Sequence, residues 1–287
     1  MIYRMHPEMK LGEVKLKVSD LERSVRFYEE IVGLKTLQRT GNEVALTADG
    51  RNALVVLEEI PGAVVTKRRS TSGLYHFAIL LPTRKDLGLS LRKLIEAGIH
   101  IGQSDHYVSE ALYISDPDNN GIEIYRDRPR EEWTYDEQGH VQMGGDPIDW
   151  DGMLREAEGH PWNGMPEGTT IGHVHFHVAD LEQSERFYCG QLGLDMMADA
   201  TVFMGALFVA AGGYHHHFGL NIWAGAGAPA APNNATGIAY ATMILPDRAA
   251  LDAVLANLRG GGVDTVEEDG AAWITDPSGI RLRLTVG

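Results

Sequence analysis

The chain carries an internal repeat, and this repeat constrains the fold more than any other feature. Residues 18–34 read VSDLERSVRFYEEIVGL, and residues 178–194 read VADLEQSERFYCGQLGL in the same register. Further along, YISDP at 113–117 is matched by WITDP at 273–277, again 160 residues later. A fixed period indicates duplication of one structural unit, so we expect two similar halves of roughly 130 residues each.

Each half divides into two smaller modules. Alternation of apolar and polar residues predicts strands, and apolar residues at helical spacing predict helices. The first module is expected to contain a strand at 14–18, a helix over 21–31 that Asp20 caps and Gly33 ends, and strands at 44–46 and 53–57. The second is expected to contain a strand at 74–81, a helix over 85–97 that stops at Gly98, and strands at 111–115 and 121–125. The third begins near Ile171 and the fourth near Gly237.

These modules predict an α+β chain with two domains, at 10–128 and 170–287, in which a βαβββ pattern occurs four times. A linker at 129–169, rich in Gly, Pro, Asp and Trp, joins the domains and is expected to hold a short helix at 150–157. Residues 225–237, GAGAPAAPNNATG, have the composition of a loop between the third and fourth modules.

Composition narrows the classes of partner. Hydrophobic residues make up 44% of the 287 residues and charged residues 23%, as in ordinary soluble globular proteins. The formal net charge of −15 argues against a nucleic-acid partner, which needs a basic surface. No segment approaches the roughly 20 apolar residues that cross a bilayer, and the N-terminus lacks an apolar signal region. We therefore expect a cytoplasmic protein with no membrane partner, and the single cysteine, Cys189, excludes an internal disulfide.

Two short motifs carry a family resemblance. One module opens with Gly172-His173, and another closes with DPDNNGIE at 116–123. With the fourfold βαβββ pattern, these motifs resemble the vicinal-oxygen-chelate superfamily, which includes glyoxalase I, bleomycin-binding proteins and extradiol dioxygenases. The closer likeness is to bacterial two-domain catechol 2,3-dioxygenases. The resemblance implies four modules paired into two open cup-shaped barrels, with a metal inside a cup.

The resemblance also implies that metal ligands come from the first and last strands of the paired modules. Module one opens with Glu13, module two opens with His76 and closes with Glu123, module three opens with His173, and module four has Tyr240 and Arg281 where module two has His76 and Glu123. A non-heme Fe(II) oxygenase needs two His and one carboxylate, and neither half supplies that set alone. Modules two and three together supply His76, His173 and Glu123. We infer that the metal cup forms between these central modules, and that modules one and four pair without a metal.

Further site residues follow from the same resemblance. The run His215-His216-His217 ends module three, and a pattern resembling HxxAL selects His216 as the acid/base residue, although Gly219 replaces the Ala. Tyr113 stands ten residues before Glu123, where related dioxygenases carry a catalytic Tyr. His106 and His217 are expected to contact the substrate, and the choice among the three consecutive histidines stays open.

Ordinary structural roles are the alternative explanation for these candidate site residues. A lone His on a strand is more often a hydrogen-bonded core residue than a ligand, and His175 and His177 share the face of His173 by strand alternation. The three consecutive histidines could form a solvated loop, and Tyr113 could be an ordinary strand aromatic. Asp116 and its neighbours are best explained by turn formation before Glu123.

The sequence therefore predicts an extradiol ring-cleaving dioxygenase that takes a small aromatic diol and O2 and uses Fe(II), with Mn(II) as the other metal that suits N/O ligands. A glyoxalase-type isomerase or lyase is the main alternative, with Glu13, Glu58, His76 and Glu123 as ligands. A metal-free binding module is the third. The ring substituents accepted and the oligomeric state, including a homo-oligomer, are left open.

Overall fold

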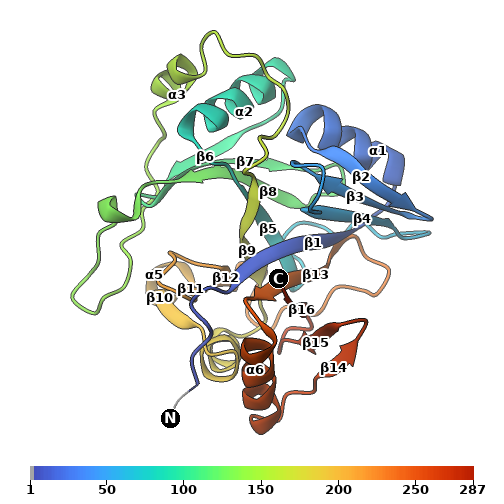
Figure 1. Cartoon of the computed structure of the whole chain (residues 1–287), viewed down its shortest axis with the longest axis vertical. Coiled ribbons are helices and arrows are strands. Elements are labelled where there is room, and N and C mark those ends of the chain that lie inside the picture. The colour runs from blue at the N-terminus through green and yellow to red at the C-terminus, as the bar shows by residue number, and fades with distance from the viewer. Residues whose placement is uncertain (1–2) are drawn as a thin grey trace.

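The structure, a computed structural model, describes residues 3–287 and contains four modules arranged as two eight-stranded sheets (Figure 1). Module one comprises β1 (Lys10–Val18), α1 (Leu21–Phe27), η1 (Tyr28–Val32), β2 (Lys35–Thr40), β3 (Glu43–Thr47) and β4 (Val55–Glu59). Module two comprises β5 (Gly73–Leu80), α2 (Arg84–Glu96), β6 (Gly102–Asp105), β7 (Ser109–Ser115) and β8 (Gly121–Asp127), and the linker holds η2 (Arg130–Glu132) and α3 (Trp150–Glu156). Module three comprises β9 (Thr170–His177), α4 (Leu181–Glu185), η3 (Arg186–Gln191), β10 (Asp195–Ala200), α5 (Thr201–Met204), β11 (Ala206–Ala210) and β12 (Phe218–Asn221). Module four comprises β13 (Gly237–Leu245), α6 (Arg248–Gly260), β14 (Val266–Glu268), β15 (Ala271–Thr275) and β16 (Arg281–Val286).

Each sheet joins modules from opposite halves of the chain. One has the strand order β14-β15-β16-β13-β1-β4-β3-β2, so module four pairs with module one. The other has the order β10-β11-β12-β9-β5-β8-β7-β6, so module three pairs with module two. The central seams are antiparallel, β13 against β1 and β9 against β5. The predicted fold and the inferred pairing of modules two and three are confirmed.

The helix of the repeated motif ends in an unusual turn. Asp20 caps α1 by accepting a hydrogen bond from the backbone N–H of Arg23, as its position predicts. After Phe27 the helix continues as a π-helical turn, η1, so the predicted helix over 21–31 is confirmed but its last turn is wider than an α-helix. Gly33 ends the turn with φ of 93°, a left-handed conformation that favours glycine.

The two repeated motifs contact each other within each half. Tyr28 of the first motif is fully buried, and its hydroxyl donates to Asp116 Oδ2 of YISDP at 3.2 Å. Tyr188 donates to Asp276 of WITDP at the same distance. Burial raises the pKa of each aspartate to about 6. The duplication therefore preserved one hydrogen bond that joins the two modules of each half.

Strand alternation separates a core face from a polar face on each sheet. Between the sheet of modules two and three and its helices, Phe77 stacks near Tyr28 and Phe176 near Phe218, with ring centres 6.5 and 5.9 Å apart. Each such fully buried ring contributes about 1.5–3 kcal/mol through its burial. Because side chains alternate along a strand, the neighbours of Phe77 and Phe176 on β5 and β9 point into the cup instead.

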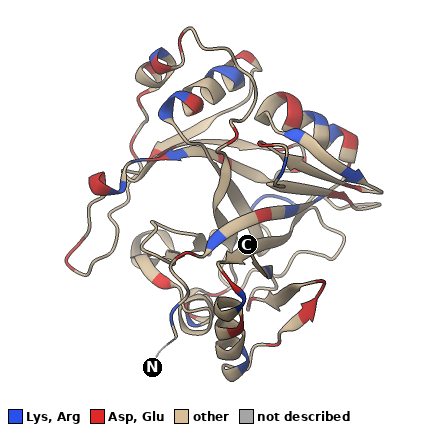
Figure 2. Ribbon diagram, viewed as in Figure 1, with Lys and Arg blue, Asp and Glu red and all other residues tan. Residues whose placement is uncertain are grey.

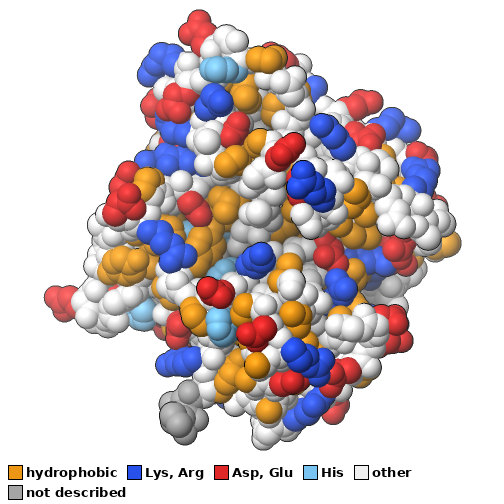
Figure 3. All heavy atoms as spheres, viewed as in Figure 1, with side chains coloured by type: hydrophobic (Ala, Val, Ile, Leu, Met, Phe, Trp, Pro, Cys, Tyr) orange, Lys and Arg blue, Asp and Glu red, His pale blue; other side chains and the backbone are white. Residues whose placement is uncertain are grey.

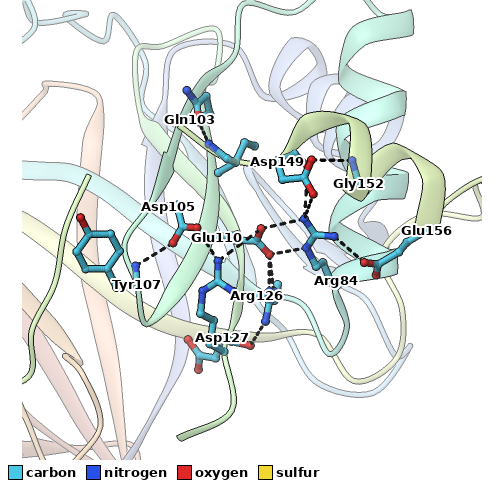
Figure 4. A network of polar contacts seen from close by, with 12 residues as sticks. Arg84, Gln103, Asp105, Tyr107, Glu110, Arg126, Asp127, Asp149, Gly152 and Glu156 are labelled. Atoms are coloured by element: carbon cyan, nitrogen blue, oxygen red, sulfur yellow. Dashed lines mark hydrogen bonds and ion pairs between the residues drawn. The ribbon is translucent and has the colours of Figure 1, made fainter. Parts of the chain in front are cut away.

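Arg84 of module two makes several ion pairs and hydrogen bonds that hold the linker. Arg84, at the start of α2, reaches Glu110 of β7 at 2.7 Å, Glu156 of α3 at 2.6 Å and Asp149 at 3.4 Å (Figure 4). Burial raises the pKa of Glu110, but hydrogen bonds from Arg84 and Arg126 outweigh it and leave that pKa lowered. These contacts hold the predicted linker helix, observed as α3, against α2.

No helix within residues 3–287 is long and apolar enough to cross a membrane. Charged residues lie mostly on helices, loops and strand ends, and the central strand β1 also carries lysines and a glutamate (Figure 2). On the face shown in Figure 3, acidic and basic side chains are interspersed, so the negative net charge does not gather there into one patch.

Candidate metal centre

Three buried side chains converge at the centre of the sheet that modules two and three form. His76 lies on β5, Glu123 on β8 and His173 on β9, which are neighbouring strands. The Nε2 atoms of both histidines lie 3.0 Å from Oε2 of Glu123, and the three candidate ligand atoms lie within 4.8 Å of one another. The structure therefore brings together the three residues predicted as metal ligands, from both halves of the chain.

Strand register explains this convergence. Ala78 of β5 pairs with Glu123 on one side and with His173 on the other, so the three positions form a row across the sheet. His76 lies two residues before Ala78 and therefore projects from the same face. The methyl group of Ala78 is small, which leaves the space above it to the surrounding ligand side chains.

The three side chains fit a divalent transition metal. Nε2 of His76 is buried and has no hydrogen-bond partner among the described residues, although Oε2 of Glu123 is near. One carboxylate oxygen lies between two ring nitrogens, and a cation bound by all three satisfies this arrangement better than a single proton does. Burial raises the pKa of Glu123, but His173 and His76 outweigh burial and hold it well below its usual range. Two imidazoles and one ionised carboxylate are the ligand set of non-heme iron oxygenases.

Two glycines allow the histidine strands to approach their neighbours. A Cβ at Gly172 would lie 1.8 Å from the Tyr125 hydroxyl, and a Cβ at Gly219 would lie 2.7 Å from the His175 ring. Gly219 therefore stands where the family pattern has Ala because the His175 ring fills the space. His175 faces the cup as alternation predicts, and burial lowers its pKa well below the usual value, yet the three-residue cluster contains His173 instead.

Hydrogen bonds define the orientation of the His216 ring. Its centre lies 4.2 Å from that of His173, and its Nδ1 lies 2.7 Å from Nδ1 of His215. Nε2 of His215 lies 2.9 Å from Oδ1 of Asp127. A carboxylate only accepts, so Nε2 of His215 carries a hydrogen, and the neutral ring accepts at Nδ1 from His216. Nδ1 of His216 therefore carries a hydrogen and its Nε2 is free to accept a proton, while burial lowers the pKa of His216 well below its usual value.

Tyr113 and His106 form a second hydrogen-bonded pair beside the centre. The Tyr113 ring centre lies 5.5 Å from that of His76, and its hydroxyl lies 2.6 Å from Nε2 of His106. Nδ1 of His106 donates to the carbonyl of Gly144 at 2.7 Å, so the neutral ring accepts from the Tyr113 hydroxyl. Burial first, and then the charge of Glu123, raise the pKa of Tyr113 well above its usual value, which keeps the hydroxyl protonated.

His217 makes different contacts. Its Nδ1 accepts from the backbone N–H of Ala211 at 3.2 Å, and its ring centre lies 5.0 Å from that of Tyr214. Burial lowers the pKa of His217 to about 3. These contacts give the residue a structural role, and its contact with substrate stays a prediction.

Tyr75 and Trp223 line the same region, although the sequence pattern does not predict them. Strict alternation would place Tyr75 on the face opposite His76. A register shift between Leu74 and His76 changes this, and the ring centre of Tyr75 lies 4.9 Å from that of His76 and 5.1 Å from that of Trp223. No sequence signal marks such a β-bulge, because it depends on pairing with the distant strand β9.

The other sheet has different residues at the equivalent positions, and one prediction about them is wrong. Strand register aligns Arg283, not Arg281, with Glu123. The two arginines differ by one strand period, so both face the same way and alternation alone could not separate them. The 160-residue offset of the repeat does separate them, because it relates position 123 to position 283. Arg281 instead lies at the start of β16, with its guanidinium carbon 4.6 Å from the Trp273 ring centre.

An ion pair lies in that sheet where the other sheet has its candidate ligands. Arg283 donates to Glu13 at 2.6 Å, and Glu58 accepts from Lys15 at 3.0 Å. Glu13 and Glu58 therefore lie in the sheet of modules one and four, whereas His76 lies in the other. The ligand set that the glyoxalase alternative requires is not brought together.

A cavity of about 560 Å³ opens beside His76 and Tyr113. It extends past Tyr75 and His177 to the loop that joins modules one and two and to the start of β13. Its volume is in the usual range of small-molecule sites. Of the three clustered residues His76 lines this cavity, which therefore leads to one side of the cluster.

Comparison with known protein families shows which superfamily the chain belongs to. A family profile described as the Glyoxalase/Bleomycin resistance protein/Dioxygenase superfamily matches residues 10–124 and 170–284. The chain belongs to this superfamily. The two matched segments are the two halves that the 160-residue repeat relates.

Within the superfamily, the chain is 48% identical to a protein named catechol-2,3-dioxygenase from Bacillus subtilis (strain 168), over 98% of this chain and 99% of that relative. A solved structure of a putative dioxygenase from Bacillus subtilis subsp. subtilis str. 168 matches with a TM-score of 0.66 at 11% identity, covering 99% of this chain and 86% of that one. Glyoxalase I from Zea mays matches with a TM-score of 0.56 at 18% identity, covering 96% and 92%. At these identities the two structural matches establish the fold alone.

Proposed function

We propose that the chain is an extradiol ring-cleaving dioxygenase that opens catechol-type rings with O2. The observation that carries the proposal is the buried cluster of His76, Glu123 and His173 beside a cavity. Full-length similarity to a protein named catechol-2,3-dioxygenase supports the reaction class. Catechol and O2 would give 2-hydroxymuconic semialdehyde, which keeps both oxygen atoms of O2.

The triad would hold Fe(II), or Mn(II), since both accept nitrogen and oxygen ligands. Such an ion supplies a Lewis-acidic template at which a diol and O2 meet and through which electron density passes between them. The protein supplies the ligands on three adjacent strands, so their mutual positions are fixed by the backbone hydrogen bonds of the sheet. Tyr75 packs against the His76 ring on the cavity side.

His216 is the proposed acid/base residue. Its ring lies against that of His173, and its Nε2 is the nitrogen left free to accept a proton. In this proposal it takes a proton from a catechol hydroxyl and returns it during ring opening. Such transfer contributes about 10²–10⁴-fold to turnover. Tyr113, held by His106, would donate its hydroxyl hydrogen to an oxygen of the substrate or product.

The glyoxalase reaction is the less supported alternative, because Glu13 and Glu58 are bound to Arg283 and Lys15 in the other sheet. A metal-free binding module leaves Nε2 of His76 without a partner. Both alternatives are tested by the experiment that tests the proposal.

The deciding experiment is anaerobic loading of metal-free protein with Fe(II), and separately with Mn(II), Zn(II) and Ni(II). Each form is then mixed with catechol and air, and the yellow ring-opened product is followed by absorbance while metal content is measured. The proposal expects product with iron or manganese at about one ion per chain, since one complete ligand set is present. Methylglyoxal–glutathione turnover by the Zn or Ni form, without ring opening, would support the glyoxalase alternative.

A further inference from the structure

The cavity beside His76 has an unusual charge. Its lining includes four cationic side chains, Lys17, Lys67, Arg68 and Arg69. The one carboxylate in the lining, Asp118, is buried and bound to Arg23 at 2.6 Å. Among residues 3–287, no carboxylate lies within 4.0 Å of any of these four cations. In a chain of net charge −15, the cavity is therefore a local region of positive charge.

Arg69 is the cation most closely connected to the metal centre. Its guanidinium carbon lies 5.9 Å from the Tyr75 ring centre and 5.8 Å from that of Trp223. Tyr75 in turn lies 4.9 Å from the His76 ring centre, so two consecutive contacts lead from Arg69 to a metal ligand. A guanidinium held on aromatic faces keeps its N–H edge free, and that edge binds a carboxylate through two parallel hydrogen bonds.

The backbone at Arg69 also indicates a specific role. Its φ of 55° lies in the left-handed region, which costs energy for a residue with a Cβ and which glycine would adopt without strain. Strained residues of this kind concentrate at binding sites. The conformation keeps a long cationic side chain at a position where the backbone alone would favour glycine.

The cations do not result from the duplication. Residues 60–73, which join modules one and two, contain three cations and no acidic residue. The equivalent loop at 225–237 contains no charged residue. The two loops lie together, with Ser72 bridged to Ala230. Positive charge is thus present only in the loop that leads into the strand of His76.

We propose that this cavity takes a catechol that carries a carboxylate on a short side chain, with the diol at the His76 end and the carboxylate against Arg69. This inference rests on the proposed function and names its substrate class. A carboxylate compensates the positive lining, and because Lys67, Arg68 and Arg69 are exposed, the attraction should weaken as salt is added. An uncharged catechol fits the same volume and leaves the lining without an anion to compensate it.

Steady-state kinetics test the preference. With 3-(3,4-dihydroxyphenyl)propionate and its uncharged amide as substrates, we expect kcat/KM for the carboxylate to exceed that for the amide about tenfold or more, the gain of one charge-assisted contact. The ratio should fall toward one in Arg69→Gln and partly in Lys67→Gln. The control Arg51→Gln changes an exposed cation outside the cavity and should leave the ratio as in the wild type. A ratio near one in the wild type, or an unchanged ratio in Arg69→Gln, overturns the inference.

Binding separates this inference from the proposed reaction. Under anaerobic conditions, calorimetry with the same two compounds gives their dissociation constants without turnover. Tighter binding of the carboxylate, weakened by Arg69→Gln and by added salt, supports the ligand class even if no ring is opened, in which case only the reaction is overturned. Ring opening with equal binding of both compounds leaves the reaction intact and overturns the ligand class.

Discussion

Arg283 and Glu13 form an ion pair of 2.6 Å at the positions in one sheet that Glu123 and His173 hold in the other. A guanidinium thus bridges two strands where the other cup has its histidine–carboxylate cluster. Both side chains are partly exposed, at 27% and 20%. Equivalent strands of the two cups therefore carry an ion pair in one sheet and a histidine–carboxylate cluster in the other.

Arg283→Met should lower the free energy of unfolding by about 1–2 kcal/mol, because Glu13 is left in a half-buried site without its partner. Metal content should not change. Urea denaturation measures the change in stability, and elemental analysis measures the metal content. The matched control is Arg281→Met, whose side chain lies over Trp273 and outside the pair. Loss of metal from Arg283→Met would contradict our assignment of the metal to the other sheet.

The triad substitutions test the cross-half site. His76→Ala, His173→Ala and Glu123→Ala should each lose most bound metal while remaining folded, since two protein ligands hold an ion much more weakly than three. Circular dichroism checks the fold and elemental analysis the metal. Glu13→Gln and Glu58→Gln serve as controls and should retain metal. If these two lose metal and His173→Ala keeps it, the ligands belong to the N-terminal half.

His216→Phe or His216→Asn should leave metal content intact and lower turnover by roughly a hundredfold or more, as removal of a general acid/base residue does. Stopped-flow absorbance on the iron-loaded protein measures this effect. Full activity in both variants would move the acid/base role to His215, His217 or another residue.

Asp127→Asn tests the hydrogen-bond chain behind His216. The Asn amide can donate to Nε2 of His215, which reverses the chain and puts the hydrogen of His216 on Nε2, where it blocks proton acceptance. We expect kcat to fall about a hundredfold with KM and metal content unchanged, and a changed histidine tautomer in ¹⁵N NMR spectra. Tyr214→Phe removes the other partner of Asp127, at 2.8 Å, and should stay within about twofold of wild type. Equal losses in both variants would indicate a merely structural role.

The stability of the metal-free protein should fall on acidification. Burial lowers the pKa of His217 to about 3, whereas an unfolded histidine titrates near 6.5. Below pH 6.5 the unfolded chain therefore binds a proton at this histidine that the folded chain does not bind. The contribution of this histidine to the free energy of unfolding is highest above pH 6.5 and decreases as the pH falls. His217→Gln should flatten the decline by up to about 1.4 kcal/mol per pH unit, measured by denaturation between pH 7 and 5. Asp116 and Asp276, with pKa raised to about 6, have the opposite effect on the pH dependence of stability. Both aspartates are present in the wild type and in His217→Gln, so they do not affect the comparison. Equal slopes for both proteins would contradict the prediction.

Much of the site could be anticipated because it depends on local periodicity. His76, Glu123 and His173 lie on strands that alternation identifies, and complementary losses in the two halves indicated which modules pair. The partners of His216 could not be anticipated, because Asp127 lies 88 residues from His215 in the sequence and meets it only when β8 and the end of module three come together. Tyr75 was missed for a related reason, since a bulge turns it into the cup.

The sequence by itself determined the four modules, their helix caps and the faces of their strands, because these follow from spacing along the chain and from side chains that bond their own neighbours. Tertiary structure alone decided which distant side chains meet: the ion pair of Arg283 with Glu13, the turn of Tyr75 into the cup, and the positive lining of the cavity. Register between distant strands is set by the packing of whole sheets, and a shift of two residues preserves every local pattern while it changes which side chains meet.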